Sequence, residues 1–131
     1  MKVFHGRAST GASERRSDTF TGMVLADPVM PQTDGVTIAT VFFAPGGRTY
    51  WHTHERGQIL HVTAGKGWVC LAGEAPREIR QGDVVFIGPN ERHWHGASSE
   101  SYMVHMAISL GKGTWQEEVA AQDYPGTEVQ A

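Results

Sequence analysis

Glycine and proline clusters divide this chain into short apolar runs, and this division constrains the fold more than any other feature. Clear breaks occur at Pro45-Gly46-Gly47, Gly65-Lys66-Gly67, Gln81-Gly82-Asp83 and Gly88-Pro89-Asn90. Short runs rich in β-branched and aromatic residues between such breaks are typical of an all-β sandwich or barrel. The predicted strands cover residues 20–25, 36–44, 49–54, 58–64, 67–71, 76–80, 83–87, 92–96 and 101–110.

One segment near the end of the chain has helical spacing instead. Trp115, Val119 and Gln122 recur at helical intervals, which predicts a short C-terminal helix over 115–122. The 131 residues suffice for one domain with a substantial core. We therefore expect a polar N-terminal arm at 1–17, contributing to a dimer contact, followed by a single domain at 18–131.

Composition excludes several classes of function. The net charge is −3 without a basic stripe, so nucleic acid is not an expected partner. No window reaches the roughly 18 apolar residues that a membrane span needs, and residues 1–16 lack the apolar core of a signal peptide. Cys70 is the single cysteine and is expected to pack as a small apolar residue. These features favour a reduced, cytoplasmic setting.

A histidine pattern predicts a metal site. His52 and His54, two positions apart, lie on the same face of an extended segment, and Gln58 keeps that parity if the strand continues. His93, from a distant strand, would complete three nitrogens and one oxygen, a set that suits Mn, Fe, Ni, Co or Zn. The amide of Gln58 is neutral, so the ion would keep its full positive charge and be a strong Lewis acid. The alternative is that these are structural histidines with internal hydrogen bonds.

Two motifs carry a resemblance to a known family. The pattern Gly46-x5-His52-x-His54-x3-Gln58-x6-Gly65 resembles the first cupin motif, with glutamine in place of the common glutamate. Residues 82–93 resemble the second motif, with Gly88 where proline is common and Asn90 in place of the turn glycine. Asparagine tolerates the left-handed backbone, so the turn can survive. The resemblance implies the cupin double-stranded β-helix, a jelly-roll barrel.

Within the cupins, the chain is similar to the small single-domain bacterial hydroxynitrile lyases. The similarity rests on its length, the His-x-His-x3-Gln run, the run 93–97 and His105 downstream. It implies cleavage of aromatic cyanohydrins such as mandelonitrile to an aldehyde and HCN, and the reverse reaction. It also implies Mn²⁺, with Fe²⁺, Ni²⁺, Co²⁺ and Zn²⁺ as alternatives. The residues implied are the metal ligands His52, His54, Gln58 and His93, the acid/base His95, and His105 nearby.

Strand parity extends the predicted interior to a substrate pocket. His95 shares the parity of His93, and His105 shares that of Ala107 and Ser109. His61 has the opposite parity to Gln58 and is expected outside the barrel or in a subunit contact, while His5 lies in the polar arm without a chemical role. The expected pocket residues are Ala39, Val41, Phe43, Thr49, Leu60 and Ser109.

Two other functions fit the same residues. One is a different cupin enzyme, such as a dioxygenase, decarboxylase or sugar-acid isomerase, with the same ligands. The other is a non-catalytic cupin that binds a metal and a small acid. In every case the expected ligand is a small molecule and the expected assembly is a homodimer, or a homotetramer. Sheet edges and exchanged N-terminal strands within 1–25 would form the contact, because exposed edge strands need cover.

Overall fold

The computed structural model describes residues 1–6 and 12–126, and nearly all regular structure in these ranges is β-strand. The prediction of an all-β fold is confirmed. The strands are β1 (Glu14–Arg16), β2 (Phe20–Thr21), β3 (Val24–Thr33), β4 (Val36–Phe43), β5 (Arg48–Thr49), β6 (His52–His54), β7 (Gln58–Leu71), β8 (Arg77–Arg80), β9 (Val84–Ile87), β10 (His93–Ala97), β11 (Met103–Leu110) and β12 (Gly113–Trp115).

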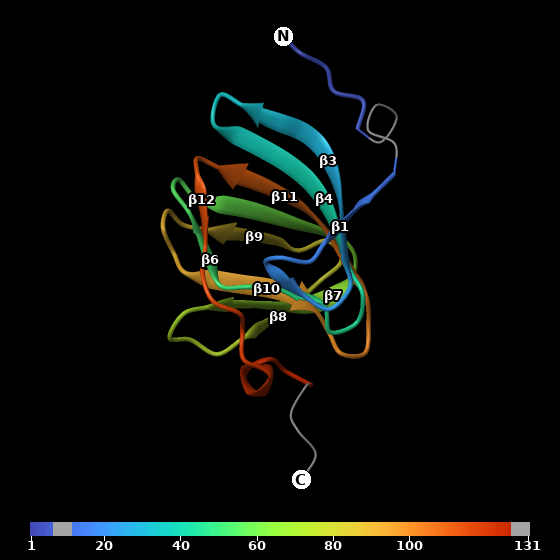
Figure 1. Ribbon diagram of the computed structural model, residues 1–131, viewed down its shortest axis with the longest axis vertical. Coiled ribbons are helices and arrows are strands. Elements are labelled where there is room, and N and C mark those ends of the chain that lie inside the picture. Colours follow the sequence, from blue (N-terminus) through green and yellow to red (C-terminus); the bar gives the residue numbers. More distant parts are fainter. Residues whose placement is uncertain (7–11, 127–131) are drawn as a thin grey trace.

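The strands form two antiparallel sheets that enclose the core of a barrel (Figure 1). Sheet A contains β1, β3, β4, β11, the first part of β7 and β9. Sheet B contains β8, the second part of β7, β10, β5 and β2, with β6 and β12 alongside β10. Phe43, Leu60, Val62 and Met103 are fully buried between the sheets. The long strand β7 therefore joins the two layers around one core.

Strand boundaries differ from the prediction where glycine or proline lies inside a strand. Strand β7 runs through Gly65, where two strands were predicted, because this glycine adopts φ 72° and lets the strand bend. A Cβ at this position would clash with the Tyr102 carbonyl oxygen, so no larger residue fits here. Strand β3 continues through Pro28 and Pro31 to Thr33, whereas the predicted strand ended at residue 25.

The helix predicted over 115–122 does not form. Trp115 ends strand β12, and the only helical turn here is a 3-10 turn, η1, at Ala121–Asp123. The backbone of Trp51 bonds both Gln116 N and Glu117 O, which holds this segment extended. The helical spacing of the side chains is therefore a weaker determinant of the backbone here than these long-range hydrogen bonds. Within residues 1–6 and 12–126, no helix has the length and apolarity to cross a membrane.

Candidate metal centre and its cavity

Five histidines and one glutamine converge between the sheets. His52 and His54 come from β6, Gln58 begins β7, His93 and His95 come from β10, and His105 comes from β11. All six side chains are buried. The register explains the convergence, because His93 pairs directly with His52 across β10 and β6.

The tightest group contains His52, His93 and His95. One ring nitrogen of each lies within 4.8 Å of the others. By ring centroids His54 is as near as His95, since each lies 5.1 Å from His52 and 5.7 Å from His93. The sequence predicted His52, His54, Gln58 and His93 as the ligands, whereas the group of close ring nitrogens contains His95 and not His54.

Backbone carbonyls fix the protonation of two of these rings. His52 Nδ1 lies 2.8 Å from the Tyr50 carbonyl oxygen, and His93 Nδ1 lies 2.8 Å from that of Glu91. A carbonyl oxygen only accepts, so each Nδ1 carries a proton and donates it. In the neutral rings the Nε2 lone pairs are therefore free, which is the usual preparation of a metal-binding histidine.

The amide of Gln58 is aimed at the same point. Its Nε2 donates to Ser109 Oγ at 3.1 Å, and its Oε1 lies 3.1 Å from His93 Nε2. With His93 protonated at Nδ1, two lone pairs face each other here, an arrangement that a bound cation relieves. Among the described residues, neither buried ring nitrogen of His54 has a hydrogen-bond partner. These unpaired acceptors fit a divalent cation with nitrogen and oxygen ligands.

A tight turn at residues 88–91 fixes the backbone just before His93. Asn90 adopts φ 58°, the left-handed conformation that its motif position requires. The Glu91 carboxylate accepts from Gly88 N at 2.6 Å, and Asn90 N donates to the His54 carbonyl oxygen at 2.8 Å. The turn therefore ties together the backbones that carry His54 and His93.

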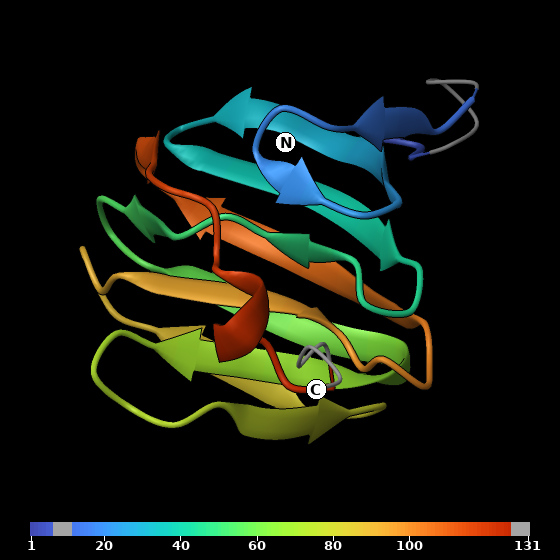
Figure 2. The same ribbon diagram turned by 60° about the horizontal axis from the view of Figure 1, so that its bottom comes forward.

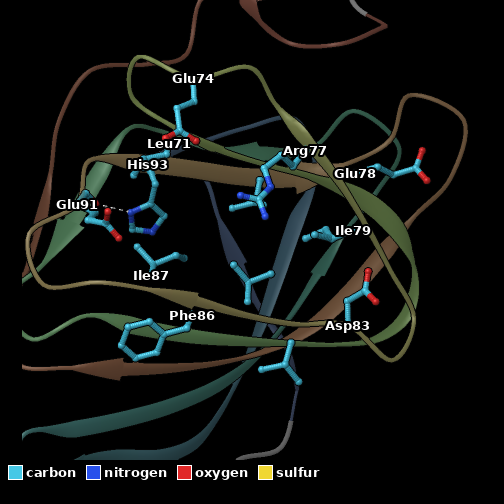
Figure 3. Close-up of a pocket in the computed structure, with 13 residues that line it drawn as sticks. Leu71, Glu74, Arg77, Glu78, Ile79, Asp83, Phe86, Ile87, Glu91 and His93 are labelled. Atoms are coloured by element: carbon cyan, nitrogen blue, oxygen red, sulfur yellow. Dashed lines mark hydrogen bonds between the residues drawn. The ribbon is translucent and has the colours of Figure 1, made fainter.

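A cavity of about 370 Å³ lies on the side of His93 that faces Glu91. Figure 3 shows Glu91 and His93 on one wall, with the hydrogen bond between them dashed, and Arg77 near the middle of the opening. The opening lies between the edge strands β8 and β9, away from the other clustered histidines. His93 is the one clustered histidine that lines it.

His95 and His105 form a hydrogen-bonded pair. His105 Nε2 lies 3.0 Å from His95 Nδ1, so one ring donates to the other. The backbone N–H of His95 donates to Thr49 Oγ1 at 3.2 Å, which helps to fix the strand at this point. His95 Nε2 is buried and has no partner among the described residues. It is therefore free to exchange a proton with a molecule in the cavity.

Burial keeps these imidazoles neutral. It lowers the pKa of His95 well below 6.5, and the neighbouring His105 and His52 lower it further. Burial lowers the pKa of His105 to about 4, and burial together with His93 lowers that of His54 to about 4. The pKa values of His52 and His93 are lowered mainly for the same reason. Near neutral pH the whole cluster is uncharged, the state in which imidazole binds metals and accepts protons.

The comparisons with known proteins agree with this geometry. The family model of the cupin domain matches residues 39–109, more than half of the chain. The chain belongs to the cupin family. The (R)-mandelonitrile lyase of Granulicella tundricola is 44% identical to this cupin over 122 residues, which are 88% of this chain and 93% of that protein.

Solved structures show the same fold. A cupin-like protein from Thermotoga maritima superposes with a TM-score of 0.81 at 37% identity, covering 95% of each chain. The polyketide cyclase RemF from Streptomyces resistomycificus superposes with a TM-score of 0.70 at 17% identity, covering 95% of this cupin and 89% of that chain. The second likeness concerns the fold alone, since cupins of this shape carry different activities.

A cavity of about 550 Å³ leads to the cluster in this cupin. Leu60, predicted in its wall, is instead fully buried in the core and is not among the lining residues. Its parity was inferred correctly, but side chains from both sheets cover it. The predicted residues that do line the cavity are Ala39, Val41, Phe43, Thr49, Ser109, His52, His54, Gln58, His95 and His105.

The sequence did not predict the mouth of this cavity. Residues 15–20, from the end of β1 to the first residue of β2, line it together with Trp115. Strand β1 pairs with β3 of the same chain, from Glu14 opposite Ala26 to Arg16 opposite Val24, and this pairing holds the segment beside the cavity. Residues 7–11 of the predicted arm lie outside the described residues. Only the polar character of the arm was visible in the sequence.

Proposed function

We propose that this cupin is a metal-dependent hydroxynitrile lyase that cleaves, and in reverse forms, aromatic cyanohydrins such as mandelonitrile. The observation that carries the proposal is the His95–His105 pair, in which His95 also lies close to His52 and His93, in a group of ring nitrogens that could hold a metal ion. The identity of 44% to a protein named (R)-mandelonitrile lyase supports the same reaction.

The metal ligands that we propose are His52, His54, Gln58 and His93, with Mn²⁺ as the ion. This choice leaves His95 Nε2, which has no partner among the described residues, free for proton transfer while His105 holds its Nδ1. We prefer His54 to His95 as the third histidine ligand, because neither of its ring nitrogens has a hydrogen-bond partner among the described residues. A divalent cation bound there acts as a Lewis acid and lowers the pKa of a substrate hydroxyl beside it.

The protein side chains move the proton. Neutral His95 takes the cyanohydrin hydroxyl proton at Nε2, while its Nδ1–H donates to His105 Nε2. As the O–H electron pair becomes the carbonyl π bond of the aldehyde, the bond between the two carbons breaks and cyanide leaves with its electron pair. The proton held by His95, or passed to His105, then returns to cyanide and gives HCN.

The cavity wall fits an aromatic substituent. Ala39, Val41 and Phe43 from β4, with Ala107 from β11, give it a mostly apolar surface. Small-molecule sites usually combine such a wall with few polar groups that fix orientation. An aromatic ring against this wall would direct the hydroxyl and nitrile toward the histidines.

The test is benzaldehyde release from racemic mandelonitrile at mildly acidic pH. Mn²⁺-loaded protein, chelator-stripped protein and a protein-free blank are compared, and both enantiomers are followed by chiral chromatography. We expect metal-dependent cleavage of one enantiomer well above the blank. Metal-loaded protein that cleaves no faster than the blank would contradict the proposal.

A further inference from the structure

The cavity of about 550 Å³ beside the histidines is larger than mandelonitrile requires. Mandelonitrile has about ten non-hydrogen atoms, which fill roughly 200–300 Å³ if each takes at most the share of one water molecule. Pockets of the observed size usually hold larger ligands. The cavity therefore has space for a substituent on the aromatic ring, and the residues at its mouth indicate the chemistry of that substituent.

An aromatic chain connects the mouth of the cavity to the histidine cluster. The Trp115 ring centroid lies 4.5 Å from that of His52 and 5.3 Å from that of Phe20. The Phe20 ring lies in turn 6.5 Å from that of Phe43. All four side chains line the cavity. A substrate ring beside this chain would point its reacting carbon toward the histidines and its far end toward residues 15–20.

The mouth gives the cavity a positive charge. Among the described residues that line it, Arg15, Arg16 and Asp18 are the ones ionised near neutral pH, because burial keeps the histidines neutral. Two guanidinium groups and one carboxylate give a local net charge of +1, whereas the whole chain carries −3. A divalent cation at the histidines would add to this charge. A cleft with an excess of one sign concentrates ligands of the opposite sign.

The register of β1 directs Arg16 toward the cavity. Arg16 is opposite Val24 on β3, and Val24 is opposite Phe43 on β4. Residues that pair directly across antiparallel strands share a face, and on this face Val24 is fully buried and Phe43 lines the cavity. Arg15 is opposite Leu25 and belongs to the other face of β1. Figure 2 shows the chain leaving β1 and looping in front of β3 and β4.

The Arg16 guanidinium has hydrogen-bond donors available for a ligand. Its one ion pair among the described residues is with Glu14, at 3.8 Å between Nη2 and Oε1, where the two side chains are 43% and 51% exposed. This distance is too long for a hydrogen bond, and an exposed pair of this kind is weak. The planar fork of N–H donors fits the two oxygens of a carboxylate.

We propose that Arg16 binds a carboxylate at the far end of an aromatic substrate. The preferred substrates of this cupin are then cyanohydrins of aromatic aldehydes that carry a carboxylate on the ring, rather than mandelonitrile itself. The reacting group in this statement rests on the proposed function, whereas the preference for a carboxylate rests on the cavity and its mouth.

The test compares a carboxylate with its neutral methyl ester on the Mn²⁺-loaded protein. Calorimetry measures the binding of 4-(hydroxymethyl)benzoate and of its methyl ester, neither of which can undergo the reaction. Kinetic assays measure kcat/KM for the cyanohydrins of 4-formylbenzoate and of methyl 4-formylbenzoate. We expect a preference of about fivefold or more for the carboxylate in both measurements, and a smaller preference at high salt because the guanidinium is half exposed.

Two adjacent arginines provide a matched pair of variants. Arg16→Gln is expected to abolish the preference for the carboxylate, and Arg16→Lys is expected to keep part of it. Arg15→Gln removes the same charge from the other face of β1 and is expected to leave the preference within about twofold of the wild type. Circular dichroism and the Mn²⁺ content establish that each variant is folded and loaded.

The binding measurement decides the inference independently of the reaction. A wild type that binds the ester as tightly as the carboxylate overturns it. So does a preference that survives Arg16→Gln, because the carboxylate would then bind the metal, and so does an equal loss in Arg15→Gln and Arg16→Gln. If binding shows the preference that depends on Arg16 but neither cyanohydrin is cleaved, the inference stands and the proposed reaction fails.

Discussion

His95 Nδ1 and His105 Nε2 lie 3.0 Å apart in the buried interior of the barrel, so the two rings share one proton. Either ring can donate, and the choice decides whether His95 offers a lone pair or an N–H to the cavity. Uptake of a proton at His95 Nε2 is thus coupled to the tautomer of His105. The pair acts as one acid–base unit with coupled titration.

Replacing His95 is expected to remove catalysis while the metal stays bound. A positioned general base contributes about 10²- to 10⁴-fold to rate, so His95→Ala should lower kcat/KM for mandelonitrile by that order. Metal content by elemental analysis is the accompanying measurement. A His95→Ala protein with bound metal and the wild-type rate would remove His95 from the mechanism.

Metal content also distinguishes the two possible ligand sets. If His54 is a ligand and His95 is not, His54→Ala should lose most of its metal after dialysis while His95→Ala keeps it. The reverse result would make the tight group of His52, His93 and His95 the metal site. His61→Ala is a matched control, because His61 is exposed on β7.

Ser109 is expected to tune metal affinity through Gln58. Its hydroxyl accepts a hydrogen bond from the Gln58 amide nitrogen at 3.1 Å and so keeps Oε1 turned toward His93. Loss of this bond costs about 1 kcal/mol, so Ser109→Ala should weaken metal binding roughly fivefold. Ser109→Thr keeps a hydroxyl and should bind nearly as well. A competition titration with a chelator measures both, and equal affinity for Ala and wild type would refute the role.

The metal-stripped protein should lose stability on mild acidification. An unfolded histidine has a pKa near 6.5, whereas burial lowers that of His105 to about 4. Between these values the unfolded chain binds more protons than the folded one, so stability falls as the pH falls from about 6.5 to 4. His105 alone accounts for up to about 3 kcal/mol across that window. Urea unfolding of wild type and His105→Gln from pH 7 to pH 4 measures the difference, and identical slopes would contradict this prediction.

The sequence predicted elements whose signals are local. Alternation along β10 and the glycine-marked turns identified His93, His95 and the position of Asn90. It did not predict the extended C-terminal segment, because that segment is held by distant groups. Arg92 stacks 4.0 Å above the Trp51 ring and pairs with Glu117 at 2.7 Å, and neither contact has a periodic signature.

Strand parity likewise predicted which side chains point inward, but it did not predict what surrounds each side chain. It directed Leu60 inward correctly but could not tell the closed core from the open cavity, which depends on neighbours from both sheets. It also assigned Ser109 to the cavity without showing that its hydroxyl would bond Gln58, 51 positions away. Hydrogen bonds across such separations follow from the assembled barrel.

The alternation along β11 has a consequence for insertions and deletions. His105 and Ala107 face the cavity, while Val104, Met106 and Ile108 alternate with them and point to the outer face of β11. A single-residue insertion before His105 would exchange the two faces of the strand, turn the His105 imidazole outward and push Met106 into the barrel. Point substitutions can therefore alter the cavity and the outer face separately, whereas a change in the length of this strand would alter both at once.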